Sequence, residues 1–285
     1  MAAGACVDHD PWDFLDLSKR SPIEKALPIV TILTLSATGS EMDMGGVISN
    51  PETKDKIGRL APAMLPKASF LDPTNTFTVS PYQTACGAAD MLSHIFEVYF
   101  NNNLDLYMLD CFMEGLMKTI IKYAPIAMRE PDNYEARANL MWTSSWAING
   151  FIDGGKRQPW SCHPIEHEVS AIYDITHGLG LAIITPRWME YCLDETTVDK
   201  FVQFGINVFG IDAKLPKMEI AKKAIAALSD FLFNTLQLKR TFPEVGIDET
   251  NFAIMAKKAV NGGTLKGFKP LQQKDVENIF EMCMR

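Results

Sequence analysis

The sequence predicts an α/β amino-terminal part followed by a larger helical domain. Short segments rich in β-branched residues, bounded by turn residues, occur before residue 80. Longer segments in which apolar residues recur with a helical period occur after it. The sequence holds no internal repeat and no low-complexity linker. We therefore expect one domain over residues 1–80 and a second over residues 81–285.

The first part is expected to contain three short strands. Residues 27–35 are apolar on both faces, which is typical of a buried parallel strand. Residues 36–41 then form a turn of small residues, whose hydroxyls and N–H groups suit a phosphate, although many loops share this composition. Residues 45–49 and 68–71 are expected as the two further strands.

The second part reads as a series of helices. Ser80 and Pro81 suit the N-cap and the first position of a helix, and residues 82–100 keep a helical pattern. The further segments with this pattern are residues 104–127, 133–151, 197–209, 218–236, 249–260 and 273–284.

Composition excludes several classes of partner. The net charge of −8, with no basic stripe, argues against nucleic acid. No run approaches the roughly 18 uncharged apolar residues of a membrane span, and the first residues lack the features of a signal peptide. The six cysteines form no C-x-x-C pair, as expected for thiols in a reducing compartment. We expect a cytoplasmic protein.

Four of the five histidines fall in two short segments. Asp90 and His94 are spaced i, i+4 on a predicted helix, which stacks them on one face. His163 and His167 share that spacing. A single histidine is more often a packed core residue, but this clustering with a carboxylate in register favours a divalent metal site. Its expected ligands are Asp90, His94, His163 and His177.

The chemistry of such a site stays open at this point. One carboxylate and three imidazoles suit Fe²⁺ and Zn²⁺ equally. The sequence HEVSA at 167–171 lacks the second histidine of H-E-x-x-H, which excludes a zincin protease. Glu166 or Glu168 could act as the base of a metallohydrolase, which is a second interpretation.

The motif D-x-x-x-H at 90–94, followed by H-x-x-x-H-x₉-H-G at 163–178, resembles the iron-activated (group III) alcohol dehydrogenases. The butanol-dehydrogenase-like subgroup, which prefers NADP, is the most similar in its flanking sequences TGSE at 38–41 and FLDP at 70–73. The resemblance covers nearly the whole chain. It implies a dehydroquinate synthase-like architecture, in which a Rossmann-like nucleotide domain, incomplete here, precedes an all-α metal-binding domain.

This resemblance also implies roles for single residues. The metal, Fe²⁺ or Zn²⁺, would be held by Asp90, His94, His163 and His177. His167 would lie beside the substrate, as a proton relay or as a hydrogen-bond partner of the ligands. Contacts with NADP or NAD would fall on Thr34, Thr38, Gly39, Ser40, Lys56, Asn75 and Thr78. The implied reaction passes a hydride between NAD(P)(H) and a short-chain alcohol or aldehyde, and a homodimer is the expected assembly.

One feature of the family is missing from the sequence. The family carries a Gly-Gly-Gly-Ser turn for the pyrophosphate ahead of the strand at Leu27, and no such turn occurs here. We therefore expect a member shortened at its amino terminus. A non-catalytic metal-binding or oligomerising remnant is the third interpretation.

Overall fold

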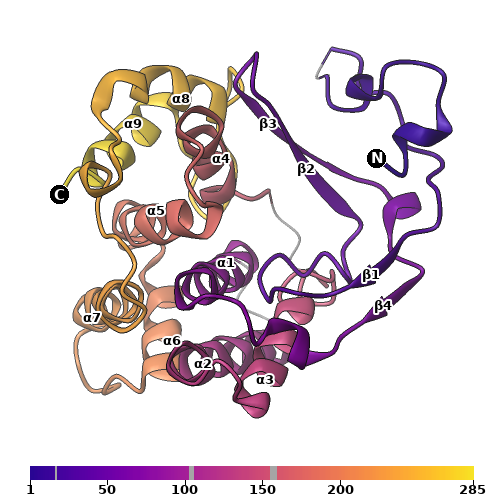
Figure 1. The fold of residues 1–285 in the computed structure, drawn as a ribbon. Helices are drawn as coiled ribbons and strands as arrows, with labels where there is room; N and C mark the ends of the chain where they lie inside the picture. The colour runs from indigo at the N-terminus through magenta and orange to yellow at the C-terminus, as the bar shows by residue number, and fades with distance from the viewer. Residues whose placement is uncertain (17, 103–105, 155–158) are drawn as a thin grey trace.

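The computed structural model describes residues 1–16, 18–102, 106–154 and 159–285 (Figure 1). In these residues the strands come first and the α-helices follow Ser80. The helices gather into a bundle, and the strands lie along one side of it (Figure 1). The strands are β1 (Val30–Ile32), β2 (Gly45–Asn50), β3 (Asp55–Leu60) and β4 (Ala68–Phe70). This order confirms the predicted fold class.

The strands form two separate pairs. β1 and β4 are parallel, with Val30 opposite Ala68, and β2 and β3 form an antiparallel hairpin. β3 was not predicted from the sequence, because Lys56 and Arg59 interrupt its apolar pattern. The hairpin nevertheless brings Lys56 to the helices, where its Nζ atom lies 3.4 Å from His177 Nδ1.

The prediction that residues 27–35 form a buried strand is wrong. Only Val30–Ile32 are strand, and Val30 is 59% and Ile32 66% exposed. A parallel strand is buried when helices and further strands cover both of its faces. Among the described residues β1 pairs with β4 alone, and Phe70 of β4 is equally exposed at 59%.

The helices match most of the predicted segments, with ends that differ by a few residues. Ser80 caps the first helix by accepting a hydrogen bond from Gln83 N, and Pro81 is its first residue. No helix in the described part of the chain is long and apolar enough to cross a membrane. The helices are α1 (Pro81–Tyr99), α2 (Tyr107–Arg129), α3 (Tyr134–Trp146), α4 (Cys162–Tyr173), α5 (His177–Cys192), α6 (Val198–Phe209), α7 (Lys217–Asp230), α8 (Phe252–Ala259) and α9 (Gln273–Met282).

Helix α5 was not predicted as a helix. It is apolar on nearly all sides, because it runs through the core, and so it shows no amphipathic period. Gly178, Gly180 and Pro186 also lower its helical propensity. Burial against neighbouring helices, rather than propensity, accounts for this element.

Helix α1 lies at the centre of the bundle and packs against α2, α3, α4 and α5. Every residue from Thr84 to Tyr99 is buried. Helix α5 approaches α1 so closely that a Cβ atom on Gly178 would lie 2.0 Å from Cys86 O. Glycine is required there, and this backbone contact places the start of α5 beside the second turn of α1.

Candidate metal centre

An aspartate and three histidines meet where α1, α4 and α5 pack together. Asp90 and His94 lie one turn apart on α1, while His163 lies in the first turn of α4 and His177 is the first residue of α5. The histidine Nε2 atoms surround Asp90 Oδ1, at 3.6 Å for His94, 4.0 Å for His163 and 3.7 Å for His177. The fold thus brings together all four residues that the sequence nominated.

The unsatisfied atoms of this cluster fit a divalent cation. Asp90, His163 and His177 each offer one atom, and these three atoms lie within 4.8 Å of one another. Among the described residues, Asp90 Oδ1 and His163 Nε2 are buried without a hydrogen-bond partner. Leaving a polar group buried and unpaired costs about 1–3 kcal/mol. A cation bound between these atoms would supply the missing partner, and an oxygen with imidazole nitrogens suits Fe²⁺ or Zn²⁺.

The imidazoles of His94 and His163 are neutral, so each can offer a nitrogen lone pair to a metal. Burial lowers the pKa of His94, against the effect of the nearby Asp90 carboxylate. Burial likewise lowers the pKa of His163 well below its usual value, and the neighbouring histidines add to this effect. The two rings stack at 4.9 Å with an interplanar angle of 12°. Neutral imidazole is the form that binds metal.

The other ring nitrogen of His177, Nδ1, contacts the side chains of Glu166 and Lys56, which carry opposite charges. His177 Nδ1 is hydrogen-bonded to Glu166 Oε2, and Lys56 Nζ lies 3.4 Å from the same nitrogen. Lys56 Nζ is also 3.7 Å from Glu166 Oε2. Burial lowers the pKa of His177, but the Glu166 carboxylate outweighs it and leaves the pKa above its usual value. Lys56, which the sequence suggested as a nucleotide contact, thus lies at the edge of the metal centre.

His167 lies beside the cluster and, with Glu166 and His177, forms a second group whose possible ligand atoms lie within 4.8 Å of one another. Its ring centre is 5.4 Å from that of His177 and 6.3 Å from that of His163. Burial and the neighbouring histidines lower the pKa of His167 to about 2, so the ring is neutral. Its side chain forms no hydrogen bond within the described ranges, which leaves its nitrogens available to a bound molecule.

Glu166 offers no free base for a metallohydrolase, whereas Glu168 keeps Oε2 without a hydrogen-bond partner among the described residues. Glu166 is fully buried and accepts hydrogen bonds from Ser170 Oγ and His177 Nδ1. Glu168 Oε2 lies 3.6 Å from Lys258 Nζ on α8. Both carboxylates already interact with groups of the protein, which weakens the hydrolytic interpretation.

The predicted nucleotide contacts other than Lys56 lie in two loops. Thr34, Thr38, Gly39 and Ser40 follow β1, whereas Asn75 and Thr78 follow β4. Because Ile32 is opposite Phe70 in a parallel pair, both loops leave the same edge of the sheet. The side chains are exposed, apart from Gly39, and form no hydrogen bond with other described residues. In the described residues, this shared edge is the geometric feature that relates the two loops to a nucleotide site.

The first loop is fixed to the helical domain. Gly39 has a φ of +62°, and a Cβ atom there would lie 2.5 Å from Ser144 O of α3. The buried Glu41 carboxylate accepts a hydrogen bond from Ser145 Oγ, and Ser69 Oγ of β4 donates to Glu41 O at 2.7 Å. The turn at 36–41 is therefore a rigid feature between β1 and α3.

One carboxylate of the site was missed at the sequence level. Glu97 lies on the same face of α1 as Asp90 and His94, seven and three residues further on. It is buried against His163, with Oε1 3.0 Å from His163 Nδ1. Burial raises the pKa of Glu97 to about 7, although backbone N–H groups oppose the effect. Its spacing from Asp90 and His94 was the available signal.

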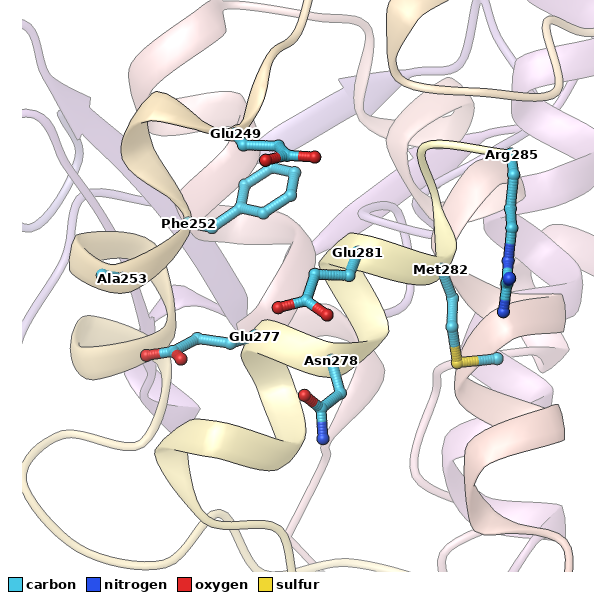
Figure 2. Close-up of a pocket in the computed structure, with 8 residues that line it drawn as sticks. All are labelled: Glu249, Phe252, Ala253, Glu277, Asn278, Glu281, Met282 and Arg285. Atoms are coloured by element: carbon cyan, nitrogen blue, oxygen red, sulfur yellow. The ribbon is translucent and has the colours of Figure 1, made fainter.

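A hollow of about 700 Å³ lies elsewhere, against α8 and α9 (Figure 2). Its lining includes the carboxylates of Glu249, Glu277 and Glu281. None of the predicted site residues lines it, and Lys274 already pairs with Glu277 and Glu281. We assign it no part in the metal centre.

Comparison with known proteins gives consistent matches. The family description "Fe-containing alcohol dehydrogenase family, C-terminal" matches residues 84–284, and "Iron-containing alcohol dehydrogenase" matches residues 1–73. NADH-dependent butanol dehydrogenase A of Clostridium acetobutylicum is 52% identical over 283 residues, which cover 99% of this chain and 72% of the relative. NADPH-dependent aldehyde reductase YqhD of Escherichia coli is 35% identical, covering 92% of this chain and 67% of the relative. The crystal structure of NADH-dependent butanol dehydrogenase A from Thermotoga maritima superposes with a TM-score of 0.92 at 37% identity, over 100% of this chain and 72% of that one.

Proposed function

The chain belongs to the iron-containing alcohol dehydrogenase family, and on this premise we propose that it is a metal-dependent alcohol dehydrogenase or aldehyde reductase. It passes a hydride between a nicotinamide coenzyme and a short-chain alcohol or aldehyde. The metal ligands in this proposal are Asp90, His94, His163 and His177.

The convergence on Asp90 is the single observation that carries the proposal. Three histidines from three helices direct Nε2 towards one buried carboxylate oxygen, within 4.0 Å of it. That oxygen has no hydrogen-bond partner in the described part of the chain. A packed core has no reason to collect these groups without a cation, because Asp90 Oδ1 and His163 Nε2 are then buried without a hydrogen-bond partner among the described residues.

Each residue of the site then has a role. When bound, the divalent metal supplies a Lewis acid that polarises the oxygen of the alcohol or aldehyde. Asp90 contributes the negative charge that balances part of the charge of the cation. His167, beside the ligands, offers a neutral ring nitrogen that accepts a hydrogen bond from the hydroxyl group of the alcohol and so orients it. Lys56, at the edge of the centre, offers a cation to the coenzyme.

The coenzyme binds along the loops that follow β1 and β4. These loops leave the same edge of the parallel pair, which is where α/β sheets hold nucleotides. The relative from Clostridium acetobutylicum is named as NADH-dependent, and YqhD as NADPH-dependent. Both coenzymes are therefore tested, with NADH expected to be preferred because the NADH-dependent relative is the more similar of these two, at 52% identity against 35%.

The test measures oxidation of reduced coenzyme by the chain loaded with Fe²⁺ or Zn²⁺, with butanal as substrate. The proposal predicts oxidation that stops when the metal is chelated and in Asp90→Asn. Glu114→Gln is the matched control, since Glu114 is a buried carboxylate of α2 bonded to Tyr99 and Asn207. Absence of oxidation with either coenzyme in a chain shown to hold the metal would contradict the proposal.

A further inference from the structure

We infer that two buried carboxylates, Glu97 of α1 and Glu166 of α4, fix the orientation and the tautomer of two metal-ligand imidazoles. Glu97 acts on His163 and Glu166 on His177. The inference rests on the proposed function only in treating these histidines as ligands. Both glutamates are positioning residues, because they contact the ligands and not the reacting atoms.

Glu97 holds His163 by its ring and by its backbone. Glu97 Oε1 accepts from His163 N at 2.7 Å and lies 3.0 Å from His163 Nδ1. Glu97 Oε2 accepts from Ser161 N at 2.8 Å. Both oxygens of the Glu97 carboxylate thus accept hydrogen bonds from backbone N–H groups. Because the carboxylate acts as the acceptor, His163 Nδ1 is the donor in the third hydrogen bond. Nδ1 of the neutral imidazole therefore carries the hydrogen, and the lone pair of Nε2 faces Asp90.

The same carboxylate caps the helix that carries His163. Helix α4 begins at Cys162, and its N-cap residue Ser161 forms no side-chain cap. Glu97, a residue of α1, caps the helix instead, because its carboxylate accepts hydrogen bonds from the N–H groups of Ser161 and His163. A negative charge at a helix amino terminus is favourable, because it satisfies unpaired N–H groups and meets the positive end of the helix dipole. Glu97 thereby fixes the position of α4 relative to Asp90.

Glu166 holds His177 in the same manner. Its Oε2 is bonded to His177 Nδ1 and its Oε1 to Ser170 Oγ. Lys56 Nζ, which carries the opposite charge, lies 3.7 Å from the same carboxylate oxygen. The carboxylate reaches His177 because residue 180 is glycine, where a Cβ atom would lie 2.5 Å from Glu166 Oε1.

Both arrangements direct Nε2 towards the same oxygen of Asp90, at 4.0 Å for His163 and 3.7 Å for His177. A ligand imidazole that must rotate or change tautomer on binding weakens the site. Loss of the carboxylate behind a ligand histidine typically lowers metal affinity about 10–100-fold. We expect a loss of that size for each glutamate.

The experiment uses Glu97→Gln and Glu166→Gln, with Glu114→Gln as the control. Glu114 is likewise buried and accepts from Tyr99 OH at 2.8 Å and from Gln203 Nε2 at 3.0 Å, but touches none of the ligands. Zn²⁺ affinity is measured by competition with a chelator. Histidine ring nitrogens are observed by ¹⁵N NMR in the metal-free chain, which reports tautomers directly. Circular dichroism and urea unfolding show whether each variant is folded.

The expected result is a loss of Zn²⁺ affinity of about 10–100-fold in Glu97→Gln and Glu166→Gln, with the control unchanged. In the metal-free chain, at a pH above the pKa of His177, the protonated nitrogen of His163 or His177 moves from Nδ1 towards a mixture with Nε2. A folded variant with unaltered tautomers and affinity would overturn the inference while leaving the proposed function standing. If the parent chain bound no Zn²⁺, the proposed function would fail, and the NMR result would still decide whether Glu97 and Glu166 fix the tautomers of His163 and His177.

Discussion

Gly178 offers a direct test of how the fold places the metal centre. A Cβ atom at this position would lie 2.0 Å from Cys86 O, whereas an ordinary contact is at least 3.4 Å. Gly178→Ala therefore requires α5 to move away from α1 by about 1.4 Å, the difference between these distances. Overpacking of this kind costs about 1–3 kcal/mol of stability.

The displacement also reaches the site, because His177 directly precedes Gly178 and its Nε2 lies 3.7 Å from Asp90 Oδ1. A misplacement of about 1 Å can cost on the order of 100-fold in catalysis. We expect Gly178→Ala to lose stability in urea unfolding and at least about 10-fold in Zn²⁺ affinity measured by chelator competition.

Gly115→Ala is the matched control for this substitution. Gly115 lies within α2, and a Cβ atom there would meet nothing within 4 Å. Alanine should therefore stabilise the protein by about 0.5–1 kcal/mol and leave the metal affinity unchanged. If Gly178→Ala behaved like this control in both assays, the close contact between α1 and α5 would not be what places His177.

Two further predictions concern charges outside the metal centre. Lys200 is 1% exposed and donates to Asp110 Oδ2 at 2.8 Å. Lys200→Met removes this cation from beside a buried carboxylate and should cost about 3–5 kcal/mol of stability in urea unfolding, which an unchanged midpoint would refute. Burial raises the pKa of Glu168 from 4.5 to about 7, although Lys258 opposes the effect. The folded state thus binds this proton more tightly than the unfolded state, and stability is lost as the pH rises from about 4.5 to about 7. Glu168→Gln should match the parent below that window and exceed it in stability above pH 7, by at most about 3 kcal/mol; equal stability at both ends would contradict the pKa shift.

Local spacing predicted the parts of the site that lie within one helix. Asp90 and His94 are four residues apart, and the structure stacks them on one face of α1 as expected. The same rule would have revealed Glu97, three residues beyond His94, had all acidic residues on that face been considered. Periodicity also located most of the helices, because amphipathic helices keep their apolar stripe in the sequence.

Long-range packing accounts for what the sequence did not predict. Helix α5 is buried on nearly all sides and so has no polar face to reveal it. Residues 30–32 are apolar as in a buried strand, but their exposure depends on which other segments cover them. Lys56 and His177 are 121 residues apart, and only the docking of the β2–β3 hairpin on the helices brings them together.

The central claim is that Asp90 and the three histidines form one metal site, and titration of the metal-free chain with Co²⁺ tests it most directly. Visible absorption of the bound Co²⁺ reports nitrogen and oxygen ligands in a site of low coordination number. We expect saturation at about one Co²⁺ per chain, with the absorption lost in Asp90→Asn and in His163→Ala, while both variants remain folded. Absorption of equal strength in those variants, or no binding by the parent chain, would contradict it.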